Sequence, residues 1–166
     1  LQLPLTTWVE KQKISGFWPD NAVTTTEKWL REGLKPRAIS RDLKWGVPIP
    51  LEKYKEKVFY VWFDALANYL TGIGFLDDVE QFKAFWPCDA HLVGKDILRF
   101  HTVYWPSFLM SLDIEPPKHV FAHGWWTIEG HKMSKSLGNV IDPNEVVKTY
   151  GVDEFRFFLL DRKSTL

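Results

Sequence analysis

The sequence predicts an α/β fold in which a parallel sheet is followed by helices. Three apolar stretches rich in β-branched or aromatic residues, at 58–63, 90–93 and 119–122, read as strands. Helix-forming segments separate them, and strands that alternate with helices at this spacing favour a parallel sheet with right-handed crossovers. Glycine or charged residues follow each strand, at the edge where open sheets of this kind bind ligands.

Composition limits the class of protein. A chain of 166 residues is about one domain long, and its 45% apolar content can form a sizeable core. The 21 basic and 21 acidic residues cancel, so no overall field would attract nucleic acid. The single cysteine, Cys88, excludes a disulfide framework and a zinc site with several thiolates, and it favours a reducing compartment. No stretch resembles a signal peptide or a membrane span, so we expect a soluble protein.

Two helices are expected before the first strand. The stretch from Thr7 to Glu10 has the spacing of a capping box, which predicts a short helix that Gly16 ends. The stretch from Thr24 to Glu27 repeats that spacing and predicts a second helix that stops at Gly33. We expect the second helix to pack one apolar stripe on the core.

Residues 36–50 are expected to form a structured loop, because three prolines and Gly46 forbid a long helix or a central strand. Two interpretations of this loop stay open. In one, Arg41 and Asp42 pair with each other in a rigid connector. In the other, Arg41 helps to shape a binding site, since a guanidinium group suits phosphate or carboxylate.

The predicted strands are joined by helices with recognisable ends. Asp64 ends the first strand, and 65–71 reads as a short helix. A longer apolar helix begins at Ile97, should kink or break before Pro106, and should finish near Leu112.

The residues around the second strand could bind a nucleotide and an apolar group. Gly94 lets a sugar or base approach the backbone, and Asp96 can accept hydrogen bonds from ribose hydroxyls or can be a plain helix N-cap. His101 lies four residues after Ile97 on the same helix face. Four side chains could line an adjacent pocket or simply fill the core: Trp62, Tyr69, His101 and Trp105.

The stretch 123–139 holds a dense polar motif. Lys-Met-Ser-Lys-Ser at 132–136 has two lysines and two hydroxyls in five residues, with Gly130 before it and Gly138 after it. Short polar side chains and glycines favour a mobile loop over a packed element. Two ammonium groups on such a loop can close on a polyphosphate and stabilise the charge that grows as a phosphate leaves, although a solvated basic turn is the alternative.

Two further helices are expected after this loop. Asp142 at the N-cap, with Pro143 and Glu145 behind it, predicts a helix that Gly151 closes. Another helix should begin at Asp153, with three apolar side chains on one face: Phe155, Phe158 and Leu159.

Several motifs carry a family resemblance. The pentapeptide at 132–136 resembles the second signature loop of class I aminoacyl-tRNA synthetases, KMSKS. Within that class the chain is similar to the methionyl-tRNA synthetase family in five motifs, which occur in the family's order. They are Arg-Asp-Leu-Lys-Trp-Gly-Val-Pro-Ile-Pro at 41–50, Val-Trp-Phe-Asp-Ala at 61–65, His-Leu-Val-Gly-Lys-Asp-Ile-Leu-Arg-Phe-His at 91–101, His-Gly at 123–124, and the lysine loop.

The resemblance implies a partial Rossmann-like nucleotide-binding domain and a methionine–tRNA ligase. Such an enzyme joins methionine to ATP, with Mg²⁺ neutralising the departing phosphates, and transfers the methionyl group to tRNA(Met). Carried over position by position, Lys132 and Lys135 would be catalytic and meet the phosphates. The methionine side chain would be surrounded by Trp62, Ala65, Leu66, Tyr69, Ile97 and His101. ATP would be bound by Gly94, Asp96, His123, Gly124, Trp125, Lys132 and Lys135.

The resemblance is to one part of the family's catalytic domain. The segment 91–94 is not the family's first signature, an HIGH-like tetrapeptide, which belongs to an N-terminal half that we expect to be missing here. The zinc-bearing insertion would be missing too, so no zinc site is expected in this chain. We interpret 1–50 as a helical segment and loop leading into the catalytic domain, 51–143 as its second half, and 144–166 as the start of a helical stem.

The resemblance also implies partners and a location. The expected partners are methionine, ATP, tRNA(Met) and the missing N-terminal half of the catalytic domain. No membrane partner is expected, and the protein is expected in the cytoplasm or in an organelle. The isolated chain is expected to be inactive. The alternative is a non-catalytic synthetase-like binding module, or an engineered chain, that keeps the fold.

Overall fold

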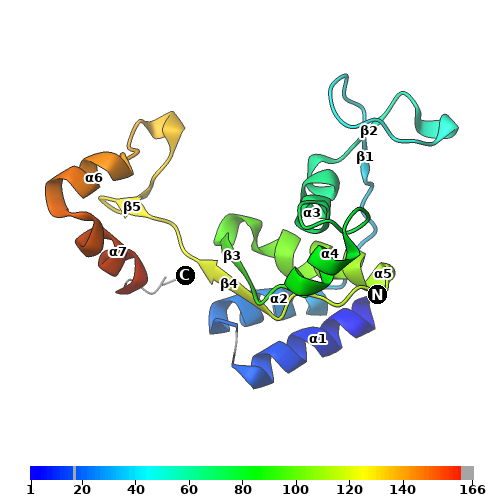
Figure 1. Ribbon diagram of the computed structural model, residues 1–166, viewed down its shortest axis with the longest axis horizontal. Coiled ribbons are helices and arrows are strands. Elements are labelled where there is room, and N and C mark those ends of the chain that lie inside the picture. Colours follow the sequence, from blue (N-terminus) through cyan, green and yellow to red (C-terminus); the bar gives the residue numbers. More distant parts are fainter. Residues whose placement is uncertain (17, 162–166) are drawn as a thin grey trace.

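The computed structural model describes residues 1–16 and 18–161. Figure 1 shows a central body with two extensions, an arm that carries β1 and β2 and a unit that carries α6 and α7. The helices are α1 (Gln2–Ser15), α2 (Asp20–Arg31), α3 (Val61–Thr71), α4 (Val79–Phe85), α5 (Trp105–Ser111), α6 (Pro143–Tyr150) and α7 (Val152–Asp161). The strands are β1 (Ser40–Arg41), β2 (Val58–Phe59), β3 (Ala90–Gly94), β4 (His119–His123), β5 (Thr127–Ile128) and β6 (His131–Lys132).

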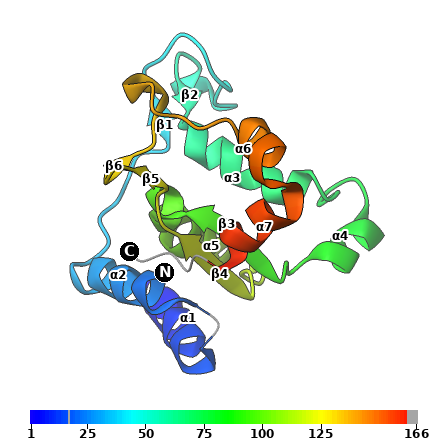
Figure 2. The same cartoon turned by 90° about the vertical axis from the view of Figure 1, so that its left-hand side faces the viewer.

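The central sheet consists of β3 and β4, which are parallel and in register from Ala90 opposite His119 to Gly94 opposite His123. Two of the three predicted parallel strands are therefore confirmed. Alternate side chains of this sheet are buried beneath α1 and α2, which lie side by side in both views (Figures 1 and 2). Leu92 and Phe121, on the opposite face, are exposed.

The prediction of a third parallel strand at 58–63 is wrong. Only Val58–Phe59 is a strand, and it pairs antiparallel with β1 in a separate sheet. From Val61 the chain is helical, because Trp62, Leu66 and Leu70 recur on one helix face and pack into the body. A short apolar run does not distinguish a buried strand from a buried helix, and here the periodicity that continues beyond 63 decides.

Both predicted capping boxes are wrong, since they lie inside helices. α1 begins at Gln2 and α2 at Asp20, and neither has a side-chain cap at its first turn. Burial of Leu5 in α1 and Ala22 in α2 stabilises these turns instead. Gly16 does end α1, in the left-handed region at φ 69°, as predicted.

Two hydrophobic clusters form the core. The first joins α1 and α2 to the central sheet through Leu5, Val9, Trp18, Ala22, Val23, Leu30, Val93, Leu98, Val103, Val120 and Ala122. The second lies between α3 and α5 and contains Leu66, Leu70, Trp86, Trp105 and Leu109. Because the first cluster includes both segment 1–31 and the sheet, the N-terminal helices are part of the same packed body.

A buried hydrogen bond fixes α2 to this body. The Thr26 hydroxyl donates to Thr102 Oγ1 at 2.9 Å, and both threonines are fully buried. We expect Thr26→Val to lower the free energy of unfolding by about 1 kcal/mol, measured by urea denaturation, because a buried hydrogen bond is removed. Thr24→Val, at an exposed position of the same helix, is the control, and equal effects of both variants would contradict this role.

The helical segment after β3 changes its hydrogen-bonding pattern just before Pro106, where the sequence predicts a kink or a break, but the chain stays helical there. It opens as a 3₁₀ turn, Lys95–Ile97, continues as a π-helix, Phe100–Tyr104, and becomes α5. Pro106 stands at the start of α5, and α5 ends at Ser111, beside the predicted Leu112. The π-helical stretch widens the helix at His101, one of the predicted site residues.

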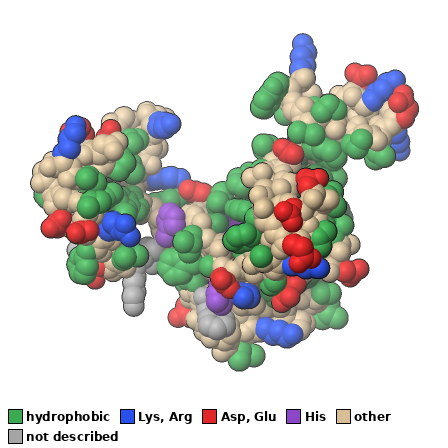
Figure 3. All heavy atoms as spheres, viewed as in Figure 1, with side chains coloured by type: hydrophobic (Ala, Val, Ile, Leu, Met, Phe, Trp, Pro, Cys, Tyr) green, Lys and Arg blue, Asp and Glu red, His purple; other side chains and the backbone are tan. Residues whose placement is uncertain are grey.

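The C-terminal unit also follows the prediction. Asp142 Oδ1 accepts a hydrogen bond from the Asn144 amide at the start of α6. α7 begins one residue earlier than expected, and the Trp126 ring packs edge-on against Phe158 at 5.8 Å. Apolar side chains are exposed on this unit and on the body (Figure 3). The division of the chain at 50 and 143 stays a prediction, and residues 162–166 of its last interval lie outside the described residues.

The loop 36–50 contains a short strand and corrects one interpretation. Arg41 does not pair with Asp42, because Asp42 forms an ion pair with Lys57. The Arg41 guanidinium instead lies 3.9 Å from the centre of the Tyr60 ring and donates to the carbonyls of Ala38 and Ser40. The chain around Arg41 is thus held by stacking and backbone contacts.

Over the described ranges, 1–16 and 18–161, no helix combines the length and the apolar character that crossing a bilayer requires.

Candidate active site

The rings of Trp62, Tyr69 and His101 lie together, as predicted. The Tyr69 hydroxyl is 2.8 Å from His101 Nε2, and the ring centres of Trp62 and His101 are 6.4 Å apart. α3 supplies Trp62 and Tyr69, whereas His101 comes from the π-helical stretch before α5. Trp62 is held by a stacked contact with Phe100 at 4.1 Å. Packing between α3 and this stretch therefore assembles the site.

His101 is held as one neutral tautomer. Its Nδ1–H donates to the Ile97 carbonyl at 3.0 Å, so Nε2 accepts the hydrogen bond from the Tyr69 hydroxyl. His101 is fully buried, and this burial lowers the pKa of its imidazole. Burial likewise raises the pKa of the Tyr69 phenol. The cluster is uncharged near neutral pH and suits an apolar ligand group.

The remaining predicted methionine-binding residues differ in exposure. Leu66 is buried within the second hydrophobic cluster and Ile97 is half-buried, packed against the first. Ala65 is exposed on α3. The ring cluster is therefore bordered by two apolar side chains that are at least partly buried, whereas the face of α3 that carries Ala65 is exposed to solvent.

His91 belongs to this cluster, although its place in the sequence did not suggest a role. Its ring lies 4.4 Å from Tyr69 and 5.4 Å from His101, and its Nε2 is 3.7 Å from Cys88 Sγ. Burial, with a smaller effect of His101, lowers the pKa of His91 to about 4. The alternation along β3 could have indicated it, since His91 shares the buried face of the strand with Val93.

The hydrogen bond between Tyr69 and His101 should be measurable in the stability of the chain. We expect Tyr69→Phe to lower the free energy of unfolding by about 1–3 kcal/mol, because His101 Nε2 would be left buried without a donor. Urea denaturation measures this change. Tyr54→Phe, in the arm, is the matched control, and a Tyr69→Phe variant as stable as that control would contradict the assignment.

All the predicted nucleotide-binding residues except Lys135 lie at or next to the carboxyl ends of β3 and β4. Gly94 is paired with His123, and a Cβ atom on Gly94 would lie 3.6 Å from His123 Cε1. Asp96 Oδ2 accepts hydrogen bonds from Trp125 Nε1 at 2.7 Å and from Lys132 Nζ at 3.0 Å. The hydrogen bond from Lys132 is the main reason why the pKa of Asp96 is lowered. Asp96 is therefore a charged acceptor rather than a plain helix N-cap.

Trp125 is surrounded by cations. Lys95 Nζ lies 3.8 Å and Lys132 Nζ 4.3 Å from the centre of its ring, and the ring itself is exposed. Gly124, between His123 and Trp125, is buried. Two ammonium groups, a carboxylate and an indole thus meet at the end of the sheet, a combination that can bind a charged, flat ligand.

The sequence predicts a mobile loop rather than a packed element around the two lysines. The structure instead shows regular secondary structure there, a hairpin followed by a 3₁₀ turn. The first part of the loop forms the β5–β6 hairpin, which contains Lys132. The Ser134 amide donates to Asn139 Oδ1, and Ser134 Oγ accepts from the Leu137 amide at a 3₁₀ turn. Lys135 begins this turn and is exposed. The two lysines therefore differ, since Lys132 is held by Asp96 and Lys135 faces solvent.

Among the described residues, no group of three or more His, Cys, Asp or Glu side chains could hold a metal ion.

Comparisons with known proteins agree with this geometry. Residues 1–165 match the family described as tRNA synthetases class I (M). The chain is 51% identical over 133 residues to the methionine–tRNA ligase of Rickettsia conorii, which is 80% of this chain and 26% of that protein. The methionine–tRNA ligase of Caldanaerobacter subterraneus is 48% identical over 144 residues, 86% of this chain and 22% of that protein.

Solved structures give the same result. Mycobacterium tuberculosis methionyl-tRNA synthetase in complex with methionyl-adenylate has a TM-score of 0.80 at 44% identity, over 94% of this chain and 31% of that one. Its apo form has a TM-score of 0.77 at 40% identity. These likenesses confirm the α/β, Rossmann-like fold class. The chain spans about a quarter of the length of the curated relatives. It belongs to the class I (M) family of tRNA synthetases.

Proposed function

We propose that this chain contributes methionine-binding and ATP-binding residues to a methionine–tRNA ligase, the activity named for its relatives. In the first step a carboxylate oxygen of methionine attacks the α-phosphorus of ATP. The bond from that phosphorus to the bridging oxygen breaks, and pyrophosphate leaves with the electron pair. In the second step a terminal ribose hydroxyl of tRNA(Met) attacks the carbonyl carbon of methionyl-adenylate, and AMP leaves.

The observation that carries this proposal is the uncharged ring cluster of Trp62, Tyr69 and His101, which contacts β3 through His91. A thioether sulfur interacts favourably with aromatic ring edges, so the cluster suits the methionine side chain. A neutral site also disfavours a charged side chain, which would lose its hydration without gaining a partner. In this proposal Ala65, Leu66 and Ile97 complete the contacts with the methionine side chain.

ATP binding in this proposal requires an exchange of partners at Asp96, whose carboxylate now accepts from Lys132 and Trp125. A ribose hydroxyl replaces the Lys132 ammonium group, and Lys132 then meets the phosphates together with Lys135. Gly94, His123 and Gly124 provide close backbone approach to the adenosine. Positioned cations of this kind stabilise the charge that develops on departing pyrophosphate.

Magnesium enters this proposal only as the counterion of the ATP phosphates. The described residues contain no group of three or more His, Cys, Asp or Glu side chains that could hold a metal ion, and Asp96 is already engaged by Lys132. They do not fit a dedicated magnesium site, and no step above is routed through the metal. A role in the cytoplasm is likewise a proposal, which follows from the family resemblance alone.

The test is methionine-dependent exchange of pyrophosphate into ATP. An HIGH-like signature is absent from residues 1–166, so we expect the chain alone to give little or no exchange. Mixing it with the segment of a relative that carries this signature should restore exchange. A mixture that binds methionyl-adenylate but never catalyses exchange would favour the alternative, a non-catalytic binding module.

A further inference from the structure

His91 contacts the ring cluster from the central sheet. It lies on β3 opposite Val120, and its side chain is buried. The centre of its ring is 4.4 Å from that of Tyr69 and 5.4 Å from that of His101. Within the described part of the chain this is the shortest ring contact of Tyr69, since His101 lies at 5.6 Å and Trp105 at 5.9 Å. His91 therefore packs against both members of the Tyr69–His101 hydrogen bond.

Tyr69 is the less firmly held member of that hydrogen bond. It lies in the last turn of α3, which ends at Thr71, and 37% of its surface is exposed. Helix ends fray, and solvent does not fix the orientation of a ring. His101, in contrast, is fully buried, and its Nδ1–H donates to the Ile97 carbonyl. The position of the Tyr69 hydroxyl thus depends on packing against a rigid neighbour, and β3 supplies one through His91.

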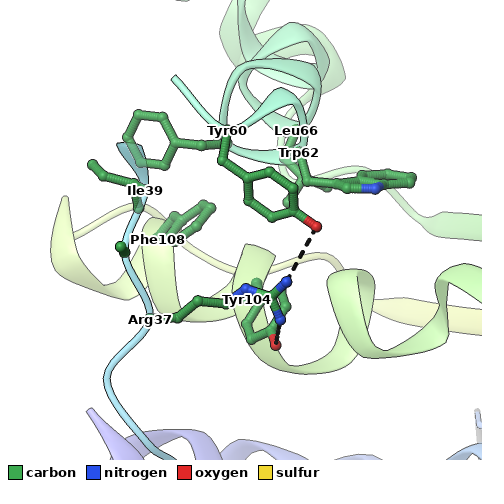
Figure 4. A pocket seen from close by; sticks show the side chains of 9 residues that line it. Arg37, Ile39, Tyr60, Trp62, Leu66, Tyr104 and Phe108 are labelled. Atoms are coloured by element: carbon green, nitrogen blue, oxygen red, sulfur yellow. Dashed lines mark hydrogen bonds between the residues drawn. The ribbon is translucent and has the colours of Figure 1, made fainter. Parts of the chain in front are cut away.

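The packing around the ring cluster is closer on the side of His91 than beside Trp62. A cavity of about 60 Å³ is lined by Trp62 and Leu66 of α3 together with Tyr60 and Tyr104 (Figure 4). Protein interiors are otherwise close-packed, so a void of this size leaves the Trp62 ring without neighbours on part of its surface. His91 has no such space to spare, because it contacts two rings of the cluster and is buried.

We propose that His91 is a positioning residue for methionine, whose ring keeps the Tyr69 hydroxyl on His101 Nε2 and Tyr69 in place for the ligand. This inference rests on the proposed function, in which methionine binds against Trp62, Tyr69 and His101. Removal of the His91 side chain leaves a cavity beside Tyr69, into which the tyrosine ring can turn. Methionine then has to restore the ring to its place. Binding is weakened by that cost, whereas the reaction at the methionine carboxylate is unaffected.

Nitrogen-15 NMR of the His101 imidazole, recorded on this chain alone near neutral pH, tests the support of Tyr69 without any activity. The Nε2 signal reports whether this nitrogen accepts a hydrogen bond. We expect His91→Ala to shift the signal towards its position in Tyr69→Phe, in which the hydroxyl is absent. Val120→Ala is the matched control, because it shortens a buried side chain opposite His91 on β4, and it should leave the signal unchanged. An unchanged signal in His91→Ala would overturn the proposal.

Pyrophosphate exchange in the mixture with the complementary segment separates positioning from a merely structural role. We expect His91→Ala to raise KM for methionine roughly tenfold and to leave kcat and KM for ATP nearly unchanged. A structural role alone would reduce the amount of active protein, so kcat would fall at constant KM. In a Tyr69→Ala background, His91→Ala should have little further effect on KM, because His91 acts through the tyrosine ring.

Two kinetic results would decide against the proposal: a fall in kcat at constant KM, and effects of His91→Ala and Tyr69→Ala that simply add. Thermal unfolding verifies that each variant is folded, and His91→Asn takes the place of His91→Ala if that variant is not. A mixture without any exchange would contradict the proposed function. An active mixture in which His91→Ala changes neither the NMR signal nor KM for methionine would contradict this inference alone.

Discussion

Replacing Lys135 by alanine is expected to reduce methionine-dependent pyrophosphate exchange by roughly a hundredfold or more, in the mixture of this chain with the complementary segment. Lys135 is exposed at the start of a 3₁₀ turn, so its ammonium group can reach a departing phosphate without breaking a buried contact. A hundredfold loss corresponds to about 2.7 kcal/mol at the transition state, which is the usual contribution of one positioned charge. The loss should appear in kcat more than in KM for methionine.

The control for this experiment is Lys148→Ala. Lys148 is also exposed, on α6, and pairs with Glu145 rather than with a group at the end of the sheet. Exchange should be unchanged in this variant. If Lys135→Ala and Lys148→Ala reduce exchange equally, or if neither does, then Lys135 does not meet the phosphates.

The free energy of unfolding is expected to decrease on acidification because His91 is buried in its neutral form. The pKa of His91 is lowered from 6.5 to about 4 in the folded chain, so the unfolded chain binds more protons between these values. The stabilisation is complete above pH 6.5 and is lost as the pH falls towards 4. The shift corresponds to about 3 kcal/mol in the free energy of unfolding. We therefore expect stability to fall steeply between neutral and mildly acidic pH.

Urea denaturation at neutral pH and near pH 4.5 measures this dependence. A His91→Asn variant should lose less stability on acidification than the unmodified chain, because one of the two buried imidazoles that take up a proton on unfolding, His91 and His101, is gone. His131→Asn, at an exposed position in β6, is the control and should keep the full pH dependence. A His91→Asn variant that loses as much stability as the unmodified chain would contradict the assignment.

The elements that could be predicted from the sequence are those whose signals are local. Asp142 caps α6 because an aspartate before a proline satisfies the first amides of a helix, wherever that helix packs. β3 and β4 form where short apolar runs are bounded by proline and glycine. Trp62, Tyr69 and His101 could be placed together from the resemblance, and the structure places them within one cluster.

The features that could not be predicted depend on contacts between distant segments. Val61 is helical because Trp62 and Leu66 pack against α5, which the local apolar run does not encode. Thr26 reads as part of a capping box, but it is buried against Thr102, 76 residues away. Asp96 and Lys132, 36 positions apart, bind each other in the structure. The sequence predicts ribose hydroxyls as the partner of Asp96 and phosphates as the partner of Lys132.

In the proposed function, the methionine side chain is bound by the rings of Trp62, Tyr69 and His101. Nuclear Overhauser effects from the ¹³C-labelled methyl group of methionine, measured in the active mixture, detect this contact. We expect cross-peaks from this methyl group to ring protons of all three residues, and their loss when unlabelled methionine is added in excess. Cross-peaks only to other rings, in a mixture that still exchanges pyrophosphate, would show that methionine binds elsewhere.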